Sequence, residues 1–404
     1  MTINRTPRRW ILTLAICLGL AVTTAGPAHA APARVRIIDL GTLGGTFSDS
    51  IAINDRGQVA GRSTTASGQF RSFIWQRGKM TDLGTLAGGD VFATAMNNRG
   101  EVVGSAFNGP NGQHSQAFLW RRGVLRNLGT LGGDSATAMD INDRGQVVGE
   151  SRTSDGSTHG FLWDKGVMTD LGTLGEPFSS AAVVNDRGQV AGSSDTATGR
   201  HRHGFVWERG RMTDFGQSNL KNDDVSPVAI NRRGQVVTYH DLDFQGDRGW
   251  TGFWDGHTLA DIGGLVFGFT AVLAFPVYPN QALNDRGQIV GWSAVESFFD
   301  DGAVHAFLWQ GGEMQDLGTL GGLWSQATAI NNSGVVAGLS QTREAGTHAF
   351  LWRKGVMTDI GTLGPGRGSP QPVAINERGD VVGSDSTSEG QHAVLWTTSR
   401  KIAG

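Results

Sequence analysis

The sequence predicts an all-β fold, a closed β-propeller of about eight four-stranded blades. Three observations predict it. A short motif recurs eight times, the spacing between its copies matches the length of one blade, and the two ends of the chain carry complementary parts of one copy. An internal repeat with a period of roughly 40 to 50 residues is typical of propeller blades.

The repeated motif is an Asn-x-x-Gly turn, followed in each unit by a Trp that closes a short apolar run. Successive Trp residues are 45, 43, 44, 47, 55, 43 and 44 residues apart. Asn accepts backbone hydrogen bonds and Gly allows positive φ, a combination that predicts a type I turn with a bulge between two strands. The turns are Asn54–Gly57, Asn97–Gly100, Asn142–Gly145, Asn185–Gly188, Asn231–Gly234, Asn284–Gly287, Asn331–Gly334 and Asn376–Gly379, and the Trp residues are Trp75, Trp120, Trp163, Trp207, Trp254, Trp309, Trp352 and Trp396.

One unit shows the order of the predicted strands. We expect strands over residues 136–141, 146–149, 159–163 and 167–171, and a connection to the next unit over 172–175. The third strand is apolar on both faces, which is typical of a sheet that packs between two other sheets. The first strands use small residues where a crowded central axis needs them, at Ala52, Ala95, Ala138, Ala182 and Ala329.

The chain ends complement each other. The last unit stops at Trp396 without its fourth strand, and residues 35–41 read as that strand alone. Pairing the two completes a blade and leaves no open edge, so we expect a monomer. Because the fifth and sixth units are irregular, seven blades plus an insertion is the alternative.

Composition limits the location and the partners. Residues 1–30 read as a signal peptide, with Arg5, Arg8 and Arg9 before an apolar segment and a small-x-small cleavage site at 28–30. We therefore expect a secreted protein, extracellular or periplasmic, with a propeller over 31–396 and a tail over 397–404. The net charge of −3 gives no sign of a nucleic-acid partner.

Two further features argue against a disulfide and a membrane span in the mature chain. The only cysteine, Cys17, lies within the expected signal peptide, so the mature chain has no disulfide. The uncharged stretch 262–277 is short for a membrane helix and contains three Gly and a Pro, which indicates a packed insertion.

Several short motifs recur in fixed order over nearly the whole mature chain. The copies His305–Trp309 and His348–Trp352, with Asp-Leu-Gly-Thr-Leu-Gly-Gly at 39–45 and 316–322, resemble the HAF-repeat family of extracellular repeat proteins. The resemblance implies export and repetition. It assigns no activity and no catalytic residue.

The repeated polar residues have structural explanations. A His recurs four residues before the Trp and could form a ring that binds a metal or another ligand. The third strands, however, lie too far from the axis for these His residues to share one ion. We therefore expect each His to be a polar residue at the strand end that packs on Phe and Trp. We expect the repeated Asn to form hydrogen bonds within its own turn rather than a functional ring around a central channel. A calcium loop at 140–145 and an anion cradle in the Gly-Thr-Leu-Gly-Gly connections are both disfavoured. We expect no metal and no cofactor. The His residues are His159, His203, His305, His348 and His392.

The candidate ligand site lies where the repeat departs from its own pattern, in the fifth and sixth units. There the loops after the second strands place aromatic residues beside carboxylates, a combination that suits sugar or peptide ligands. The alternative is a degenerate blade whose aromatic residues fill its core. The candidate residues are Tyr239, His240, Asp241, Asp243, Trp250, Trp292, Glu296, Phe298 and Asp300.

Three function classes follow. The leading one is a non-catalytic binding or scaffolding module whose partner is a polysaccharide or an extracellular protein. The second is an extracellular carbohydrate-active hydrolase or lyase, which needs two carboxylates across a cleft. The third is a structural surface protein without a ligand. No catalytic residue is assigned, and the carboxylates open to the second class are Asp241, Asp243, Glu296, Asp300 and Asp301.

Overall fold

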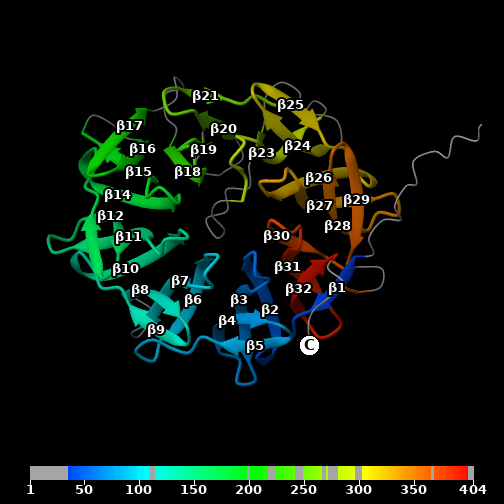
Figure 1. Cartoon of the computed structure of the whole chain (residues 1–404), viewed down its shortest axis with the longest axis horizontal. Helices are drawn as coiled ribbons and strands as arrows, with labels where there is room; N and C mark the ends of the chain where they lie inside the picture. The colour runs from blue at the N-terminus through cyan, green and yellow to red at the C-terminus, as the bar shows by residue number, and fades with distance from the viewer. Residues whose placement is uncertain are drawn as a thin grey trace, which may run out of the picture. The chain divides into compact units, whose positions relative to one another are not determined.

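The computed structural model describes residues 35–108, 114–197, 201–216, 224–241, 249–265, 270–271, 281–295, 303–364 and 368–398. The described residues form one compact unit. The expected signal peptide at 1–30 lies outside the described residues. The blades surround a central opening, with the first strand of each blade innermost (Figure 1). The all-β propeller of eight four-stranded blades is therefore confirmed, and the seven-blade alternative is wrong.

Each blade is an antiparallel sheet that runs outward from the channel. Blade 1 contains β2 (Gly44–Ile53), β3 (Val59–Thr65), β4 (Phe70–Gln76) and β5 (Lys79–Asp82); blade 2 contains β6 (Asp90–Met96), β7 (Val102–Asn108), β8 (His114–Arg121) and β9 (Val124–Asn127). Blade 3 contains β10 (Gly132–Ile141), β11 (Val147–Thr153), β12 (Thr158–Asp164) and β13 (Val167–Asp170); blade 4 contains β14 (Gly175–Val184), β15 (Val190–Thr196), β16 (Arg202–Glu208) and β17 (Arg211–Gly216).

The second half of the ring repeats this order. Blade 5 contains β18 (Asp224–Ile230), β19 (Val236–Asp241), β20 (Gly249–Trp254) and β21 (Leu259–Asp261); blade 6 contains β22 (Thr270–Ala271), β23 (Ile289–Ala294), β24 (Val304–Gln310) and β25 (Glu313–Asp316). Blade 7 contains β26 (Gly321–Ile330), β27 (Val336–Thr342), β28 (Thr347–Arg353) and β29 (Val356–Gly361); blade 8 contains β30 (Gln371–Ile375), β31 (Val381–Ser386), β32 (Gln391–Thr397) and β1 (Arg36–Asp39).

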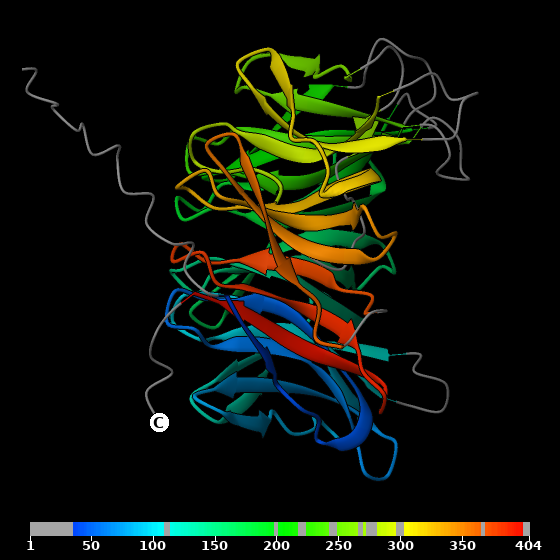
Figure 2. The ribbon, with the colours of Figure 1, turned by 90° about the vertical axis from the view of Figure 1, so that its right-hand side faces the viewer.

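The two chain ends close the ring in blade 8. β1, in blue, lies beside β32, in red (Figure 2), and the two pair antiparallel with Ile37 opposite Trp396. Trp396 is only 1% exposed, so this closing strand completes a buried core. β32 also includes Thr397, which is buried, so the tail begins one residue later than expected.

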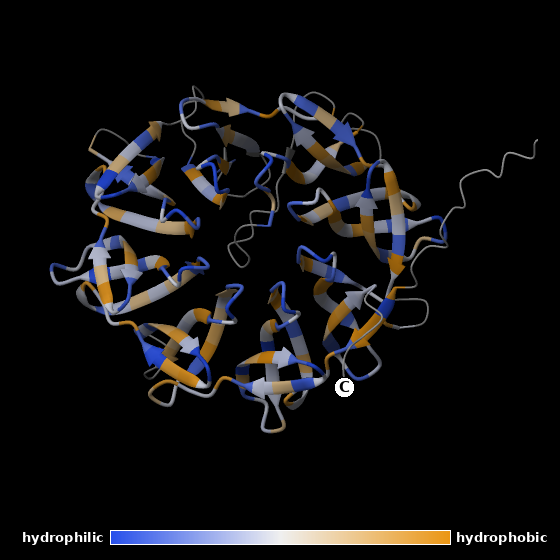
Figure 3. Cartoon of the chain, viewed as in Figure 1, coloured by the Kyte–Doolittle hydropathy of each residue, from blue (hydrophilic) through white to orange (hydrophobic). Residues whose placement is uncertain are grey.

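The core lies between neighbouring blades. A third-strand Phe is fully buried in six of the blades, and Phe161, for example, lies in one core cluster with Ala95 from the first strand of the neighbouring blade. Figure 3 shows hydrophobic residues along the strands of the blades, whereas the turns around the central opening are hydrophilic. Stability therefore comes from packing between sheets, as expected for a chain that lacks disulfides. The buried Phe residues are Phe73, Phe118, Phe161, Phe205, Phe307 and Phe350.

A glycine in the second strand lets the first strand approach closely. In blade 3 a Cβ at Gly149 would lie 1.9 Å from the carbonyl oxygen of Thr137. The same conflict would arise at Gly61, Gly104 and Gly338. Next to this contact the register shifts between Ala138 and Asp140, which is a β-bulge. The bulge bends the end of the first strand, where its turn faces the channel.

The described part of the chain contains no helix long and apolar enough to span a membrane. Of the uncharged stretch 262–277, only residues 262–265 and 270–271 are described, and the last two form β22. Ile262 is buried in the cluster that joins blades 5 and 6.

Candidate functional site

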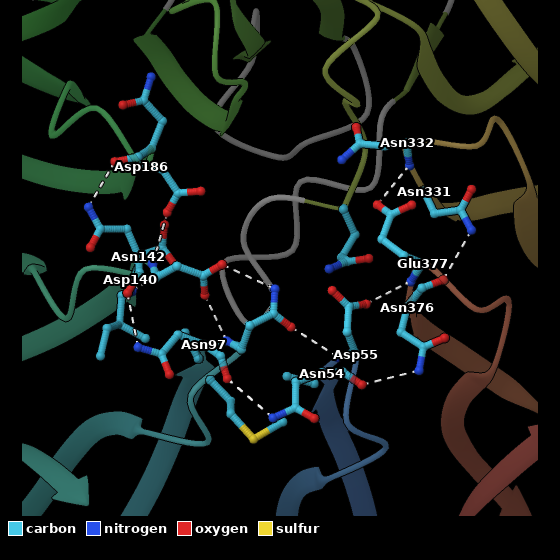
Figure 4. A pocket seen from close by; sticks show the side chains of 18 of the residues that line it. Asn54, Asp55, Asn97, Asp140, Asn142, Asp186, Asn331, Asn332, Asn376 and Glu377 are labelled. Carbon is cyan, nitrogen blue, oxygen red and sulfur yellow. Dashed lines mark hydrogen bonds between the residues drawn. The ribbon is translucent and has the colours of Figure 1, made fainter.

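The repeated asparagines form a closed ring of hydrogen bonds around the channel. Each Nδ2 donates to the main-chain oxygen of the Asn in the next blade, at distances from 2.8 Å to 3.4 Å. The last member, Asn376, donates to Asn54 at 3.1 Å and so closes the ring (Figure 4). All eight Asn residues are buried.

Each Asn also builds its own turn, as the sequence predicts. In blade 3 the Oδ1 of Asn142 accepts the N–H groups of Arg144 and Gln146, both at 3.0 Å. Gly145 closes the turn with a φ of +82°. The expected turn role is therefore confirmed, but it is incomplete, because the opposite end of the same amide links neighbouring blades.

The residue after each Asn forms a second ring at the mouth of the channel. Its side-chain oxygen accepts the N–H of the preceding blade, as Asp143 does from Asn98 at 2.8 Å and Glu377 from Asn332 at 3.0 Å. Arg232 interrupts the series and pairs with Asp186 at 3.2 Å and Asp285 at 3.7 Å. Partial burial disfavours the charge of Arg232, but these two carboxylates outweigh it and raise the pKa of the guanidinium.

The rings enclose a polar cavity of about 280 Å³ that is lined by the inner strands and turns of all eight blades. Asp140 is the one carboxylate in its wall at a position where other units have Ala or Val, and it is 5% exposed. Its Oδ1 accepts the N–H of Ile141 at 2.8 Å, and its Oδ2 accepts that of Val184 at 2.9 Å. Asp140 thus joins two blades. No group of three His, Cys, Asp or Glu side chains suited to a metal occurs among the residues that the structure describes.

The repeated His pairs with a carboxylate, not with the aromatic rings that we expected. In blade 3 the Nδ1 of His159 lies 2.8 Å from Asp170, the Asp of the Asp-Leu-Gly motif. Asp170 also accepts the N–H of Gly172, so it holds both the His and the connection. The equivalent pairs are His203–Asp214, His305–Asp316, His348–Asp359 and His392–Asp39, at 2.8 to 3.0 Å.

Both positions change together in blade 2, whereas blades 1 and 5 keep the Asp, as Asp82 and Asp261. Arg71 stands in the His position of blade 1 and lies 4.0 Å from Asp82, and Gln116 stands in that of blade 2, where Asn127 replaces the Asp. The pairs therefore tie the third strand of a blade to its fourth. They lie near the rim of the ring, apart from the channel wall.

We expect the His348–Asp359 pair to contribute about 0.5 kcal/mol to folding, because both side chains are partly exposed to solvent. A double-mutant cycle with His348→Ala and Asp359→Ala, followed by urea unfolding at neutral pH, measures this coupling. A coupling of several kcal/mol would contradict the assignment of a minor structural role.

The structure places two of the predicted ligand residues in the interior of blade 5. His240 is fully buried, Trp250 is 9% exposed, and their rings stack with centroids 3.6 Å apart. The Nε2 of His240 lies 2.8 Å from the Oγ1 of Thr238. The two rings therefore lie inside the blade rather than on its surface. Their packing matches the alternative in which aromatic residues fill a blade core.

The other predicted residues divide into two groups. Tyr239 and Trp292 are half-buried in β19 and β23, so part of each side chain reaches the surface. Asp241 is described for its backbone only. The site itself stays a prediction, because its remaining members, Asp243, Glu296, Phe298 and Asp300, lie outside the described residues, as does Asp301.

A run of aromatic side chains that sequence reasoning missed crosses blades 1 and 2. Phe47 contacts Phe70 edge-on at 5.7 Å, Phe70 lies 6.3 Å from Phe92, and Phe92 contacts Phe107 edge-on at 5.5 Å. We call these four residues the phenylalanine run. Phe70 and Phe107 are 41% and 40% exposed. A sequence signal was available for Phe70, because it stands at the start of its strand, where most other units have a polar residue.

An ion pair lies within this run. Arg71 follows Phe70 in β4, and its Nη1 lies 2.5 Å from Asp90, which pairs with Phe107 across the sheet of blade 2. Arg71 also donates to the carbonyl oxygen of Phe70 at 2.9 Å. The pair fixes the separation of the two blades beneath the exposed rings.

No known protein-family model and no curated protein matches the chain. Solved propeller structures resemble it at low identity. The propeller domain of the Trilobed protease from Pyrococcus furiosus is 12% identical with a TM-score of 0.47, over 78% of this chain and 96% of that domain. A puromycin-hydrolyzing peptidase of Mycobacterium tuberculosis is 13% identical with a TM-score of 0.47, over 87% of this chain and 57% of that one.

A third structure, TolB from Acinetobacter baumannii, is 16% identical with a TM-score of 0.38, over 53% of this chain and 54% of TolB. The match thus spans little more than half the length of TolB and of the peptidase. At these identities the likeness extends to the fold alone. The chain is a β-propeller, and its function has to be argued from its own surface.

Proposed function

We propose that the chain is an exported, non-catalytic binding module of the HAF-repeat type, and that the phenylalanine run holds its ligand. The observation that carries the proposal is an exposed aromatic strip, fixed from two blades, on a ring that is closed at its centre by hydrogen bonds. Exposed apolar strips with a polar rim are typical of interaction sites. The expected signal peptide and the recurrent motifs support export and the family.

The geometry of the run favours a protein ligand over a glycan. Phe has no hydroxyl or indole N–H to bond a sugar, and the edge-on contacts at both ends of the run leave no flat platform. Apolar side chains of an extended segment fit between such rings, and Asp90, whose side chain is 41% exposed, offers a charged partner beside them. A glycan ligand is the other outcome of the test below.

The hydrolase or lyase alternative draws no support from the described chain. Its carboxylates lie outside the described residues, except for Asp241, of which only the backbone is described. The carboxylates that the structure does describe at the channel mouth accept backbone N–H groups and hold blades together.

The test is binding of residues 31–404 to peptide and glycan arrays, with single variants of the run. Phe70→Ala and Phe107→Ala should each weaken binding at least tenfold, because exposed aromatic anchors commonly carry most of the affinity of such sites. The matched control is Val167→Ala, at a side chain that is 66% exposed at the start of β13. Tyr239→Ala and Trp292→Ala test the site predicted from the sequence.

Binding that both Phe variants retain would overturn the phenylalanine run as the ligand site. If Tyr239→Ala and Trp292→Ala abolish that binding instead, the ligand contacts blades 5 and 6. Absence of any ligand on both arrays would favour a structural surface protein.

A further inference from the structure

We propose that the channel contains a binding site for a small carboxylate between blades 1 and 2, formed by the N–H groups of Ile53 and Met96. The chain itself fills the equivalent site between blades 3 and 4 with the carboxylate of Asp140. This site lies in the central cavity, so it does not depend on the function proposed for the phenylalanine run.

The N–H of the residue before each repeated Asn points into the channel. Asn54 donates its N–H to the carbonyl oxygen of Gln58, so these two residues form a hydrogen-bonded pair. Ile53 and Val59 form the next pair of the same antiparallel ladder. Because hydrogen-bonded and non-hydrogen-bonded pairs alternate, the N–H of Ile53 points away from β3 and toward the axis. Met96 occupies the equivalent position before Asn97 in blade 2.

Four of these N–H groups donate to an acceptor identified among the described residues. Asp140 accepts from Ile141 and Val184, one carboxylate oxygen for each blade. Across the channel, Gln281 accepts from Ile330 through its main-chain oxygen at 2.9 Å and from Ile375 through its side-chain oxygen at 3.4 Å. Two adjacent blades thus present a pair of donors, and an oxygen pair on one residue satisfies both.

Blades 1 and 2 have the donors without the acceptor. Ala52 stands two residues before Asn54, where blade 3 has Asp140 before Asn142. No described side chain or loop carbonyl accepts from the N–H of Ile53 or Met96. Both residues line the cavity, together with Ala52 and Ala95. Because residue 52 is Ala and not Asp, the position that an Asp carboxylate would take is the position that we assign to a small carboxylate ligand.

A carboxylate suits this pair better than a neutral oxygen. Its two oxygens accept one N–H from each blade, as those of Asp140 do, and hydrogen bonds to a charged acceptor are the stronger ones. The carboxylates at the channel mouth repel an anion, which favours a small monovalent acid over a polyanion. Each of the five carboxylates accepts a backbone N–H, and this contact offsets part of its charge; the five are Asp55, Asp143, Asp186, Asp285 and Glu377.

The first test is titration of residues 31–404, labelled with ¹⁵N-Ile and ¹⁵N-Met, with sodium acetate. The amide signals of Ile53 and Met96 should shift together and saturate at millimolar acetate, whereas sodium chloride at equal ionic strength should leave them in place. Acetamide, with one acceptor oxygen and no charge, should bind at least tenfold more weakly. Signals of Ile53 and Met96 that do not respond to acetate would overturn the proposal.

Variants test the same geometry from within the chain. Ala52→Asp copies Asp140 into blade 1 and should abolish the acetate-induced shift of Met96. Ala329→Asp is the matched control, because the N–H groups of Ile330 and Ile375 already bond Gln281, so acetate binding at Met96 should persist. Asp140→Ala removes the acceptor of the N–H groups of Ile141 and Val184. This variant should unfold at a lower temperature than the wild type, and acetate, but not chloride, should restore part of the lost melting temperature. Equal acetate responses of the wild type and Ala52→Asp would contradict the assigned site.

Discussion

Asn331→Ala is expected to lower the free energy of unfolding by about 3 kcal/mol or more. The buried amide of Asn331 accepts the N–H groups of Ser333 and Val335 at 3.1 Å and 3.0 Å and donates to Asn376 at 3.0 Å. Alanine removes all three bonds and leaves buried N–H groups without an acceptor. Urea unfolding followed by Trp fluorescence measures the loss.

The next residue provides the control. Asn332 is half-buried, and its Oδ1 accepts a single N–H, that of Asp285, at 2.7 Å. Asn332→Ala should therefore cost about 1 kcal/mol. Equal losses for the two variants would show that the ring of asparagines contributes no more to stability than the ring at the channel mouth.

Removal of β1 is expected to have the second large effect. A chain that starts at residue 41 loses the ladder between β1 and β32 and the packing of Ile37, Ile38 and Leu40 in the last blade. Burial of three such side chains contributes about 5 kcal/mol, which corresponds to a loss of roughly 10 °C in the melting temperature of a large domain. The exposed edge of β32 should also promote association.

Calorimetry and light scattering of two truncated chains test this expectation. The chain that starts at residue 35 keeps β1 and should melt like the chain from residue 31. A synthetic peptide of residues 35–41 should restore part of the lost stability to the chain that starts at residue 41. Equal melting temperatures of all three chains would contradict a closing role for β1.

The sequence predicts the fold because each blade repeats the same local chemistry. The positions of Trp163 and Asn142 in one unit recur in the other seven, so one assignment serves the whole ring. The long first strand was underestimated: β10 begins at Gly132, in a Gly-rich segment that reads as a connection. Its pairing with Thr153 depends on a neighbouring strand, and local composition does not show it.

The site was harder to predict because its bonds join distant residues. The Nδ2 of Asn376 reaches the oxygen of Asn54 over a separation of 322 residues, and only the closed ring brings the two together. The joint change of His159 and Asp170 to Gln116 and Asn127 is a signal that the sequence does contain. It could have predicted the pair of strands that these residues connect.

The break in the repeat at blade 5 has a physical reason other than a ligand. Trp250 takes the third-strand position of the repeated His, and His240 lies directly opposite in β19, so their stacked rings fill one space in the blade. Two coupled substitutions therefore look like a functional departure when they are read along the chain. In space they form one unit of packing.

The ring of asparagines also bears on how such a molecule can change size. Every unit gives one hydrogen bond to the unit ahead and receives one from the unit behind, and the last unit bonds the first in the same way. A duplicated unit would bring its own donor and its own acceptor, and a deleted unit would remove both. The number of links would always equal the number of blades. A ring of this kind can therefore gain or lose whole repeats, and every Asn Nδ2 still finds a main-chain oxygen in the next blade. The ring at the channel mouth differs, because Arg232 pairs specifically with Asp186 and Asp285 of the two neighbouring blades.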